Sequence, residues 1–197
     1  MKIESFTKEK IIGPLIFTPK IYADERGYFF ESWNKKQFLN FIEKSQEIIN
    51  QKKEIAFVQD NQSFSSKNVL RGLHYQVNPH AQGKLVSCIN GEIFDVVVDL
   101  RKNSPSFGRW AGLILSGTNS KQLWIPEGFA HGFLSLSEKT KVLYKTTNYW
   151  NKQSERSLKW DDPIIDIKWP LLKSSPILSK KDSIANSLNN IDKDDLF

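Results

Sequence analysis

A chain of 197 residues, of which 39% are hydrophobic, is long enough to bury one sizeable core and short for two ordinary domains, so we predict one domain over residues 1–197. The formal net charge of +6 favours an anionic partner: a nucleic acid, an acidic membrane surface or a phosphorylated small molecule. The basic residues are spread along the chain without a nucleic-acid-binding motif, which favours a small anionic ligand.

Membrane spans and export signals are not expected from the pattern. No stretch approaches the roughly 18 consecutive apolar residues of a transmembrane helix. The N-terminal sequence MKIESFTKEK lacks the apolar run and cleavage site of a secretory signal. The single cysteine, Cys88, rules out an internal disulfide and suits a reducing compartment, so we expect a cytoplasmic protein.

The first third of the chain mixes strand and helix patterns. Residues 11–33 are expected to form short strands around the turn ADERG. Residues 35–44 place Phe38 and Ile42 at helical spacing, which predicts a short amphipathic helix. Residues 45–54 are polar and form either a loop or an extension of that helix.

From residue 55 onward the pattern indicates strands separated by turns. The segments are IAFVQDNQSF, NVLRGLHYQ, KLVSCI, IFDVVVDL, RWAGLILS, KQLWIPE, GFLSLSE and KVLYKTTNYW. About six to eight such strands predict an all-β antiparallel sandwich or barrel with short flanking helices. The Asn90–Gly91 pair between two of them predicts a hairpin. The polar tail, about residues 185–197, is expected to be flexible.

Strand parity locates two candidate carboxylates in IFDVVVDL. Asp95 and Asp99 lie on one face of this strand together with Ile93 and Val97. They are site candidates if that face lines a barrel, and they are solvated if it faces water. We favour solvated side chains for both.

His74 is the most informative of three histidines. In VLRGLHYQ, strict alternation places it on the face opposite Arg71, so the two contact one ligand only if Gly72 forms a bulge or the ligand spans the sheet edge. A metal site is disfavoured because Gln76 stands where a His-x-His pair would be completed and His80 lies in an expected loop. A lone strand histidine is usually structural; the functional alternative is a general base, since an unperturbed imidazole pKa of about 6.5 suits proton transfer.

Several sequence blocks, taken in order, identify a family. They are DERGYFFESW, FVQDNQS, VLRGLHYQ, GKLVSCINGEIFDVVVDLR, SPSFGRWAGLILS, QLWIPEGFAHGFL, LYKTTNYW, SER, WDDP and LSKKD. With this set the chain closely resembles the dTDP-4-dehydrorhamnose 3,5-epimerase family, the RmlC-type enzymes of the cupin superfamily. The resemblance runs from about residue 10 to about residue 185; one block alone would be a weak signal, whereas the ordered set is specific.

The resemblance implies a cupin-type jelly-roll β-barrel and a homodimer in which the N-terminal arm, about residues 1–33, is exchanged with the partner. It also implies a cofactor-free epimerisation, at C3 and C5, of dTDP-4-dehydro-6-deoxy-D-glucose to dTDP-4-dehydro-L-rhamnose, a step of dTDP-L-rhamnose biosynthesis. The 4-keto group acidifies the protons on C3 and C5, so the reaction needs a base, enolate stabilisation and an acid. An epimerase acting at one carbon, a ketoisomerase and a non-catalytic nucleotide-sugar-binding cupin remain as alternatives.

The resemblance assigns four catalytic residues. His74 matches the base and Asp182 the carboxylate that orients it, although the sequence alone favours a surface acid for Asp182. Lys84 matches the enolate-stabilising cation; otherwise it is an exposed strand lysine. Tyr144 matches the acid; otherwise it packs in an aromatic core. His131 matches a sugar-contacting histidine and is equally compatible with a structural turn.

Nucleotide contacts follow from the same resemblance. The residues assigned are Arg26, Glu31, Gln59, Asn61, Arg71, Glu155 and Lys180. The planar fork of arginine suits phosphate oxygens, which favours Arg26 and Arg71. In a family-like dimer, Arg26 and Glu31 would serve the partner's site. Trp150 stands where the family stacks a tyrosine on thymine, with the adjacent Tyr149 as an alternative.

Four features depart from the family pattern. Gln62 stands where histidine is common, Phe64 replaces a frequent arginine, and Asn90 replaces a basic residue. Residues 45–54 are longer than the usual connection. None of these removes a proposed catalytic group, but they leave open the sugar configuration and whether both carbons are epimerised.

Overall fold

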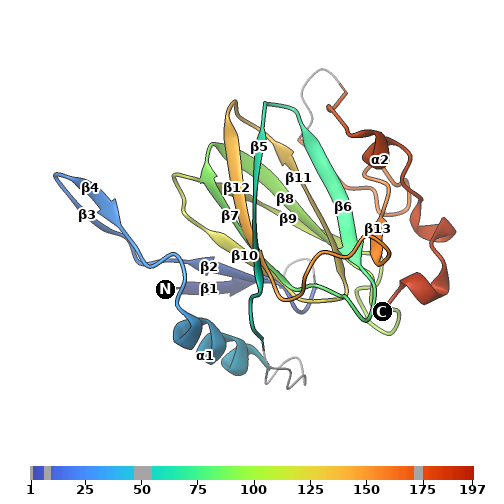
Figure 1. Cartoon of the computed structure of the whole chain (residues 1–197), viewed down its shortest axis with the longest axis horizontal. Coiled ribbons are helices and arrows are strands. Elements are labelled where there is room, and N and C mark those ends of the chain that lie inside the picture. The colour runs from blue at the N-terminus through green and yellow to red at the C-terminus, as the bar shows by residue number, and fades with distance from the viewer. Residues whose placement is uncertain (1, 7–9, 47–54, 171–174) are drawn as a thin grey trace.

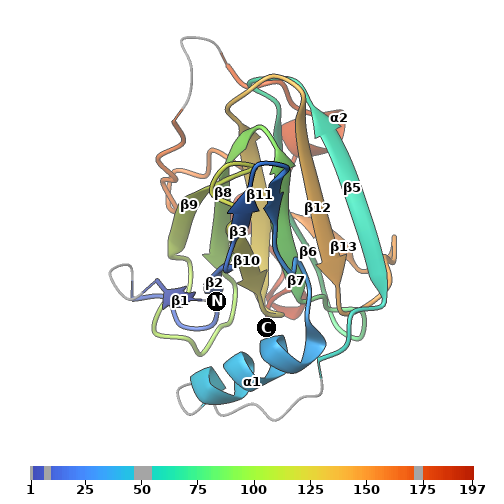
Figure 2. The same ribbon diagram turned by 90° about the vertical axis from the view of Figure 1, so that its left-hand side faces the viewer.

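The computed structural model describes residues 2–6, 10–46, 55–170 and 175–197. Over these residues the chain forms two antiparallel sheets that lie face to face, with helices outside them (Figures 1 and 2). The six-stranded sheet has the order β1 (Lys2–Ser5), β2 (Leu15–Thr18), β10 (Gln122–Ile125), β7 (Lys84–Asn90), β12 (Thr140–Thr146) and β5 (Gln59–Ser65). The five-stranded sheet has the order β13 (Glu155–Ser157), β6 (Leu70–Gln76), β11 (Phe129–Ser135), β8 (Glu92–Asp99) and β9 (Trp110–Ser116).

Three smaller parts lie outside the two sheets. The strands β3 (Tyr22–Asp24) and β4 (Gly27–Phe29) pair as a hairpin that projects from the body at the left of Figure 1. Helix α1 (Lys35–Gln46) precedes β5, and the short helix α2 (Lys180–Ser183) lies near the C-terminus. Two 3₁₀ turns, Leu188–Asn190 and Lys193–Asp195, follow α2. The predicted all-β architecture with short flanking helices is confirmed, with two facing sheets in place of a closed barrel. No helix in the described ranges is long and apolar enough to cross a membrane.

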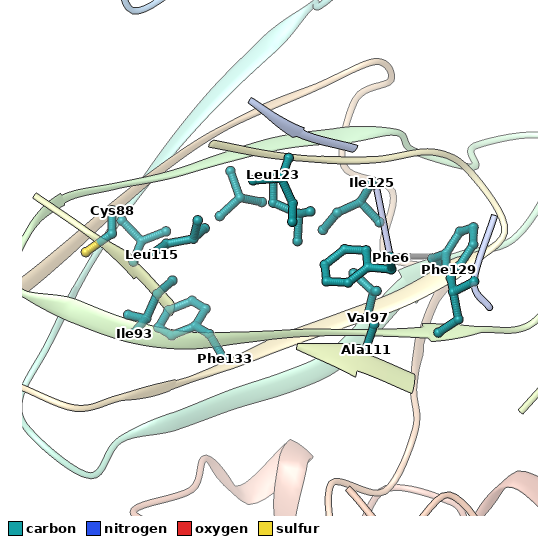
Figure 3. Packing of buried hydrophobic residues seen from close by; sticks show 14 residues of the cluster. Phe6, Cys88, Ile93, Val97, Ala111, Leu115, Leu123, Ile125, Phe129 and Phe133 are labelled. Carbon is teal, nitrogen blue, oxygen red and sulfur yellow. The ribbon is translucent and has the colours of Figure 1, made fainter. Parts of the chain in front are cut away.

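The main core fills the space between the sheets (Figure 3). Leu123 and Ile125 reach in from the six-stranded sheet, and Val97 and Phe133 reach in from the five-stranded sheet. Alternate residues of each strand point inward, as the pleat of a β-strand requires. This alternation determines which polar side chains also enter the interior.

The other face of the five-stranded sheet is buried as well. Val96, Val98 and Leu100 pack there against a second cluster that includes Leu158 and Trp169 from the C-terminal part of the chain. Strand β8 is therefore covered on both faces.

The expectation of solvated carboxylates on β8 is wrong for both residues. Asp95 and Asp99 are 0% exposed because their face of β8 is turned to the interior between the sheets. Asp99 forms an ion pair with Arg101 at 2.7 Å and accepts hydrogen bonds from Ser104 and Ser106. The parity was predicted correctly, but the side of the sheet that faces water was not.

The predicted hairpin at Asn90–Gly91 is also wrong. Strand β7 pairs with β10 and β12, while β8 pairs with β9 and β11, so the two strands lie in opposite sheets. Gly91 does adopt a φ of 78°, which a tight reversal requires. The dipeptide signals a turn but does not determine the ladder partners, and here the turn carries the chain from one sheet to the other.

Helix α1 covers the outer face of the six-stranded sheet. Phe38 and Ile42 pack against Phe17, Leu85 and Trp124 in a third apolar cluster. The helix predicted for residues 35–44 is confirmed and runs two residues further. The remainder of the uncertain stretch, residues 47–54, lies outside the described residues.

The C-terminal tail packs against the five-stranded sheet. Leu188 is buried, and the Phe197 amide donates to the Leu100 carbonyl at 3.2 Å. Asp195 forms an ion pair with Arg156 at 2.7 Å. A few apolar residues are enough to hold a polar tail in place, because they pack on the outer face of the five-stranded sheet and remove apolar surface there from water.

Candidate active site

A cavity of about 490 Å³ opens between the two sheets. Its walls come from β5, β7 and β12 on one side, from β6, β11 and β13 on the other, and from α2. The lining residues are Gln59, Asn61, Ser63, Arg71, His74, Tyr75, Gln76, Gln82, Lys84, His131, Gly132, Phe133, Tyr144, Trp150, Glu155, Ser179, Lys181 and Asp182. Polar and ionisable groups from segments far apart in sequence therefore meet in one place.

A bulge in β6 brings Arg71 and His74 to the same face. Against β11, His74 pairs with His131 and Arg71 pairs with Phe133, so two residues of β6 oppose one of β11. Gly72 has a φ of 124°, and a Cβ there would lie 2.6 Å from the Cα of Gly132. Only glycine fits this approach. The bulge that was required for the two side chains to share a ligand is present.

A partly buried His74 pairs with a buried Asp182. The Nε2 of His74 lies 2.6 Å from Oδ1 of Asp182, whose exposed fraction is 3%. The amide of Asp182 donates to Ser179, the N-cap of α2, and the Gly72 amide donates to the Asp182 carboxylate. Asp182 is therefore not a surface acid, because the chain on either side of it is bridged to the five-stranded sheet and its edge.

The pKa values of both groups are lowered, which favours a neutral His74 and an ionised Asp182. Burial lowers the pKa of His74, and the hydrogen bond that His74 donates to Asp182 offsets only part of this effect. Burial on its own raises the pKa of Asp182, but hydrogen bonds from His74, Ser179 and Gly72 outweigh it and hold the pKa below its ordinary value. An ionised carboxylate fixes a proton on Nε2 and leaves Nδ1 of His74 as a lone-pair acceptor.

Lys84 enters the cavity from the opposite sheet. It is 8% exposed, and its Nζ donates to the carbonyl oxygen of His74 at 3.2 Å. Burial lowers the pKa of Lys84 to about 8, with the charges of Asp95 and Glu155 acting in the other direction. It is therefore not an exposed strand lysine, and at neutral pH most molecules carry the positive charge.

Tyr144 lines the cavity from β12, on the sheet opposite His74. It also packs at the edge of the main core, so the aromatic-packing alternative describes one side of the ring. Burial raises the pKa of Tyr144, which keeps the phenol protonated at neutral pH. A proton donor and a proton acceptor thus approach the cavity from opposite walls.

His131 forms a second histidine–carboxylate contact. Its Nε2 lies 2.8 Å from Oδ1 of Asp95, and both side chains are buried. The sequence indicated His131 but not this partner, because Asp95 was expected in water. No group of three or more His, Cys, Asp and Glu side chains suited to a metal ion occurs in the part of the chain that the structure describes.

Most of the residues predicted to bind the nucleotide line this cavity: Gln59, Asn61, Arg71, Trp150 and Glu155. The guanidinium of Arg71 donates to Ser65 and to the Phe64 carbonyl, which holds it in place. The Trp150 side chain is 55% exposed at the rim, whereas Tyr149 is not part of the lining.

Lys181, not Lys180, reaches the cavity. Its Nζ lies 2.8 Å from the Glu155 carboxylate, while Lys180 is exposed and absent from the lining. The motif LSKKD offers two adjacent lysines, and only the start of α2 at residue 180 determines which one turns inward. A helix predicted for residues 180–183 would have indicated that Lys181 faces the cavity.

Arg26 and Glu31 lie on the arm and outside this cavity. Arg26 bonds to Asp24 at the tip of the β3–β4 hairpin, where it is fully exposed. Glu31 accepts hydrogen bonds from Asn34 and Gln37. The structure therefore does not bring these two residues to the cavity of their own chain.

The fold and the cavity define a β-sandwich protein whose interior gathers a histidine–aspartate pair, a tyrosine and basic groups suited to an anionic ligand. The sequence model described as dTDP-4-dehydrorhamnose 3,5-epimerase matches residues 8–190. The dTDP-4-dehydrorhamnose 3,5-epimerase of Shigella flexneri is 53% identical over 175 residues, which cover 89% of this chain and 91% of that protein. The chain therefore belongs to the dTDP-4-dehydrorhamnose 3,5-epimerase family.

Solved structures support the same assignment. The RmlC epimerase of Legionella pneumophila, in complex with dTDP-4-keto-L-rhamnose, is 46% identical with a TM-score of 0.85, over 99% of this chain and 97% of that chain. A 3'-monoepimerase of Streptomyces bikiniensis, in complex with dTDP-quinovose, is 29% identical with a TM-score of 0.80, over 91% of this chain and 86% of that chain. The two sheets are thus those of a cupin-type jelly roll.

Proposed function

We propose that this chain epimerises dTDP-4-dehydro-6-deoxy-D-glucose at C3 and C5 to give dTDP-4-dehydro-L-rhamnose, a step of dTDP-L-rhamnose biosynthesis. The observation that carries the proposal is the hydrogen-bonded His74–Asp182 pair, which lines one cavity together with Tyr144 from the opposite sheet. The identity of the substrate is inferred from relatives of this chain that are named for this reaction. The chemistry below uses only side chains of this chain.

His74 removes the proton. Its Nδ1 takes the proton from the carbon beside the 4-keto group, and the electron pair of the C–H bond passes to the C4 oxygen to form an enolate. The imidazolium that results is stabilised by Asp182. The Asp182 carboxylate stays ionised because the hydrogen bonds it accepts lower its pKa by more than burial raises it.

Lys84 and Tyr144 complete the exchange. The Lys84 ammonium stabilises the negative charge on the C4 oxygen in a site largely shielded from water. Tyr144 then gives its phenolic proton to the carbon from the opposite wall, so the configuration inverts. Both groups return to their starting protonation states by exchange with solvent, and the second carbon follows the same sequence.

The nucleotide is held by the rim and by the basic groups. Arg71 and Lys181 face the diphosphate, with Lys181 taking the role first assigned to its neighbour. Trp150 offers an exposed indole to the thymine ring. Gln59 and Asn61 bond to each other at 2.9 Å and present amides to the base and sugar.

A homodimer with exchanged arms places Arg26 and Glu31 in the partner's cavity. The β3–β4 hairpin exposes Tyr22, Tyr28 and Phe29, which are more apolar than a free arm requires. A second cavity, of about 270 Å³, separates this arm from the outer face of the six-stranded sheet. These apolar surfaces favour a second copy of the chain as their cover.

A nucleotide-sugar substrate and one buried cysteine favour a cytoplasmic location.

The test is incubation with dTDP-4-dehydro-6-deoxy-D-glucose in deuterated water, followed by NMR. Deuterium at C3 and C5, lost in the His74→Ala variant, together with a product that a rhamnose-forming reductase accepts, is the expected result. Deuterium at one carbon only would assign an epimerase that acts at a single carbon. The fold is compatible with this alternative, because the Streptomyces monoepimerase shares it. No deuterium, with dTDP still bound, would point to a ketoisomerase of another substrate or to a binding protein.

A further inference from the structure

Asp95 is a buried carboxylate that the mechanism above leaves without a role. It is 0% exposed, and its Oδ1 accepts a hydrogen bond from Nε2 of His131 at 2.8 Å. Its Oδ2 is equally buried and accepts no hydrogen bond from any residue that the structure describes. Because an unpartnered carboxylate oxygen is costly in a dry interior, a compensating positive charge is expected close by.

Lys84 is the complementary group in the opposite sheet. Its ammonium has three protons to donate, and the hydrogen bond found for it within the described ranges goes to the His74 carbonyl. Lys84 shares the inner face of β7 with Val86, and Asp95 shares the inner face of β8 with Val97. Because both valines belong to the core between the sheets, the ammonium and the carboxylate face the same interior.

The negative charges of Asp95 and Glu155 both act to raise the pKa of Lys84 against the effect of its burial. Glu155 is already paired with Lys181 at 2.8 Å, so its charge is partly neutralised. Among the residues that the structure describes, the Asp95 carboxylate has the His131 imidazole within salt-bridge distance and no lysine or arginine. The ionisable groups that face this space from the surrounding elements are Arg71, His74, Tyr75, Asp95, His131, Tyr144, Glu155, Lys181 and Asp182.

We propose that Asp95 is a positioning residue with two partners: its carboxylate keeps the Lys84 ammonium charged beneath the substrate's C4 oxygen, and it fixes a proton on Nε2 of His131. Nδ1 of His131 is then the ring nitrogen available to a sugar hydroxyl. The inference deepens the proposed function, because it assigns the group that sustains the enolate-stabilising charge.

A double-mutant cycle on the free protein tests the Lys84 partnership without any substrate. Asp95→Asn leaves a buried ammonium uncompensated, and Lys84→Met leaves a buried carboxylate uncompensated, so the double variant should be more stable than the sum of the two losses by about tenfold in the unfolding equilibrium constant. The matched control is Asp99→Asn, on the same face of β8 and equally buried but held by Arg101. Its cycle with Lys84→Met should be additive. Additivity in both cycles would overturn the partnership.

Nitrogen-15 NMR tests the His131 partnership in the unaltered chain, which has only three histidines to assign. A proton on Nε2 of His131 is expected, and a ring protonated on Nδ1 alone would overturn that part of the inference. Neither this measurement nor the cycle needs turnover, so an inactive protein that passes both would refute the proposed function and still leave the partnerships of Asp95 with Lys84 and His131 in place.

The kinetic readout follows if the chain is active. Removing the Asp95 charge lowers the pKa of Lys84 below about 8, so the alkaline limb of the pH–rate profile should move down by about one pH unit in Asp95→Asn. Asp99→Asn should leave the limb in place. A folded Asp95→Asn variant with an unmoved limb would show that Asp95 does not act through Lys84.

Discussion

Replacing Asp182 by asparagine removes one negative charge while keeping the shape of the side chain. The carboxylate accepts the proton of Nε2 of His74 across 2.6 Å, and it is 3% exposed, so solvent does not substitute for it. An asparagine amide turned toward His74 donates to Nε2 instead. The proton then moves to Nδ1, the nitrogen that must accept the substrate proton. Only the minor tautomer, or a rotated amide, remains competent.

The expected loss in kcat for Asp182→Asn is up to about 10⁴-fold, which is the loss seen when the same change puts the histidine of a serine protease triad in the wrong tautomer. This corresponds to at most roughly 5 kcal/mol of transition-state stabilisation. The dissociation constant for dTDP should change by less than about threefold, because Asp182 bonds to His74 and not to the groups proposed to hold the nucleotide.

The assay is the rate of deuterium incorporation at C3 and C5, with dTDP affinity measured by calorimetry on the same samples. The matched control is Asp161→Asn, an exposed acid of the same C-terminal region that is 3.6 Å from Lys159. It should retain full activity because exposed ion pairs contribute little. A folded Asp182→Asn variant that incorporates deuterium within tenfold of the wild-type rate would refute the role of the pair.

Three further outcomes are expected. The kcat/KM of the enzyme should rise with pH as His74 loses its proton, at a pKa below the ordinary value for histidine, and should fall as Lys84 loses its proton at about pH 8. A profile that keeps rising beyond about pH 9 would contradict the cationic role of Lys84. Gly72→Ala should lower the unfolding free energy by about 3 kcal/mol or more in denaturant titrations, because of its positive φ and the close Gly132 backbone, whereas Gly27→Ala, with a similar φ and open space, should cost less. Mixing inactive Arg26→Ala and His74→Ala chains should restore activity through mixed dimers, and no restoration after verified subunit exchange would contradict the shared site.

The architecture was largely accessible from the sequence because strand alternation and turn residues are local signals. The helix at 35–44 and the strands after residue 55 appear within a few residues of their predicted bounds. The failures concern which segments pair and which face is wet. The Asn90–Gly91 turn joins two sheets, and Asp95 lies in the interior, since both depend on contacts with β11 and β12 that no local pattern contains.

The candidate site shows the same division. Residue types were chosen from motifs, but their geometry depends on single backbone features. Two adjacent lysines in LSKKD are equivalent in a sequence, yet the start of α2 sends Lys181 into the cavity and leaves Lys180 outside. Asp182 likewise reads as a surface acid until the segment that carries it is bridged to the five-stranded sheet.

The bulge at Gly72 connects the fold to the chemistry. A regular β6 would place Arg71 and His74 on opposite faces, one toward the cavity and one toward the outer core. The extra residue lets Leu70, Leu73 and Tyr75 fill the outer core while both polar side chains face the cavity. The same Gly72 contributes its amide to Asp182. One backbone irregularity therefore brings His74, Asp182 and Arg71 to one cavity. If the proposed roles of these residues are correct, a variant that restores regular pairing at Gly72 is expected to lose turnover and diphosphate binding together.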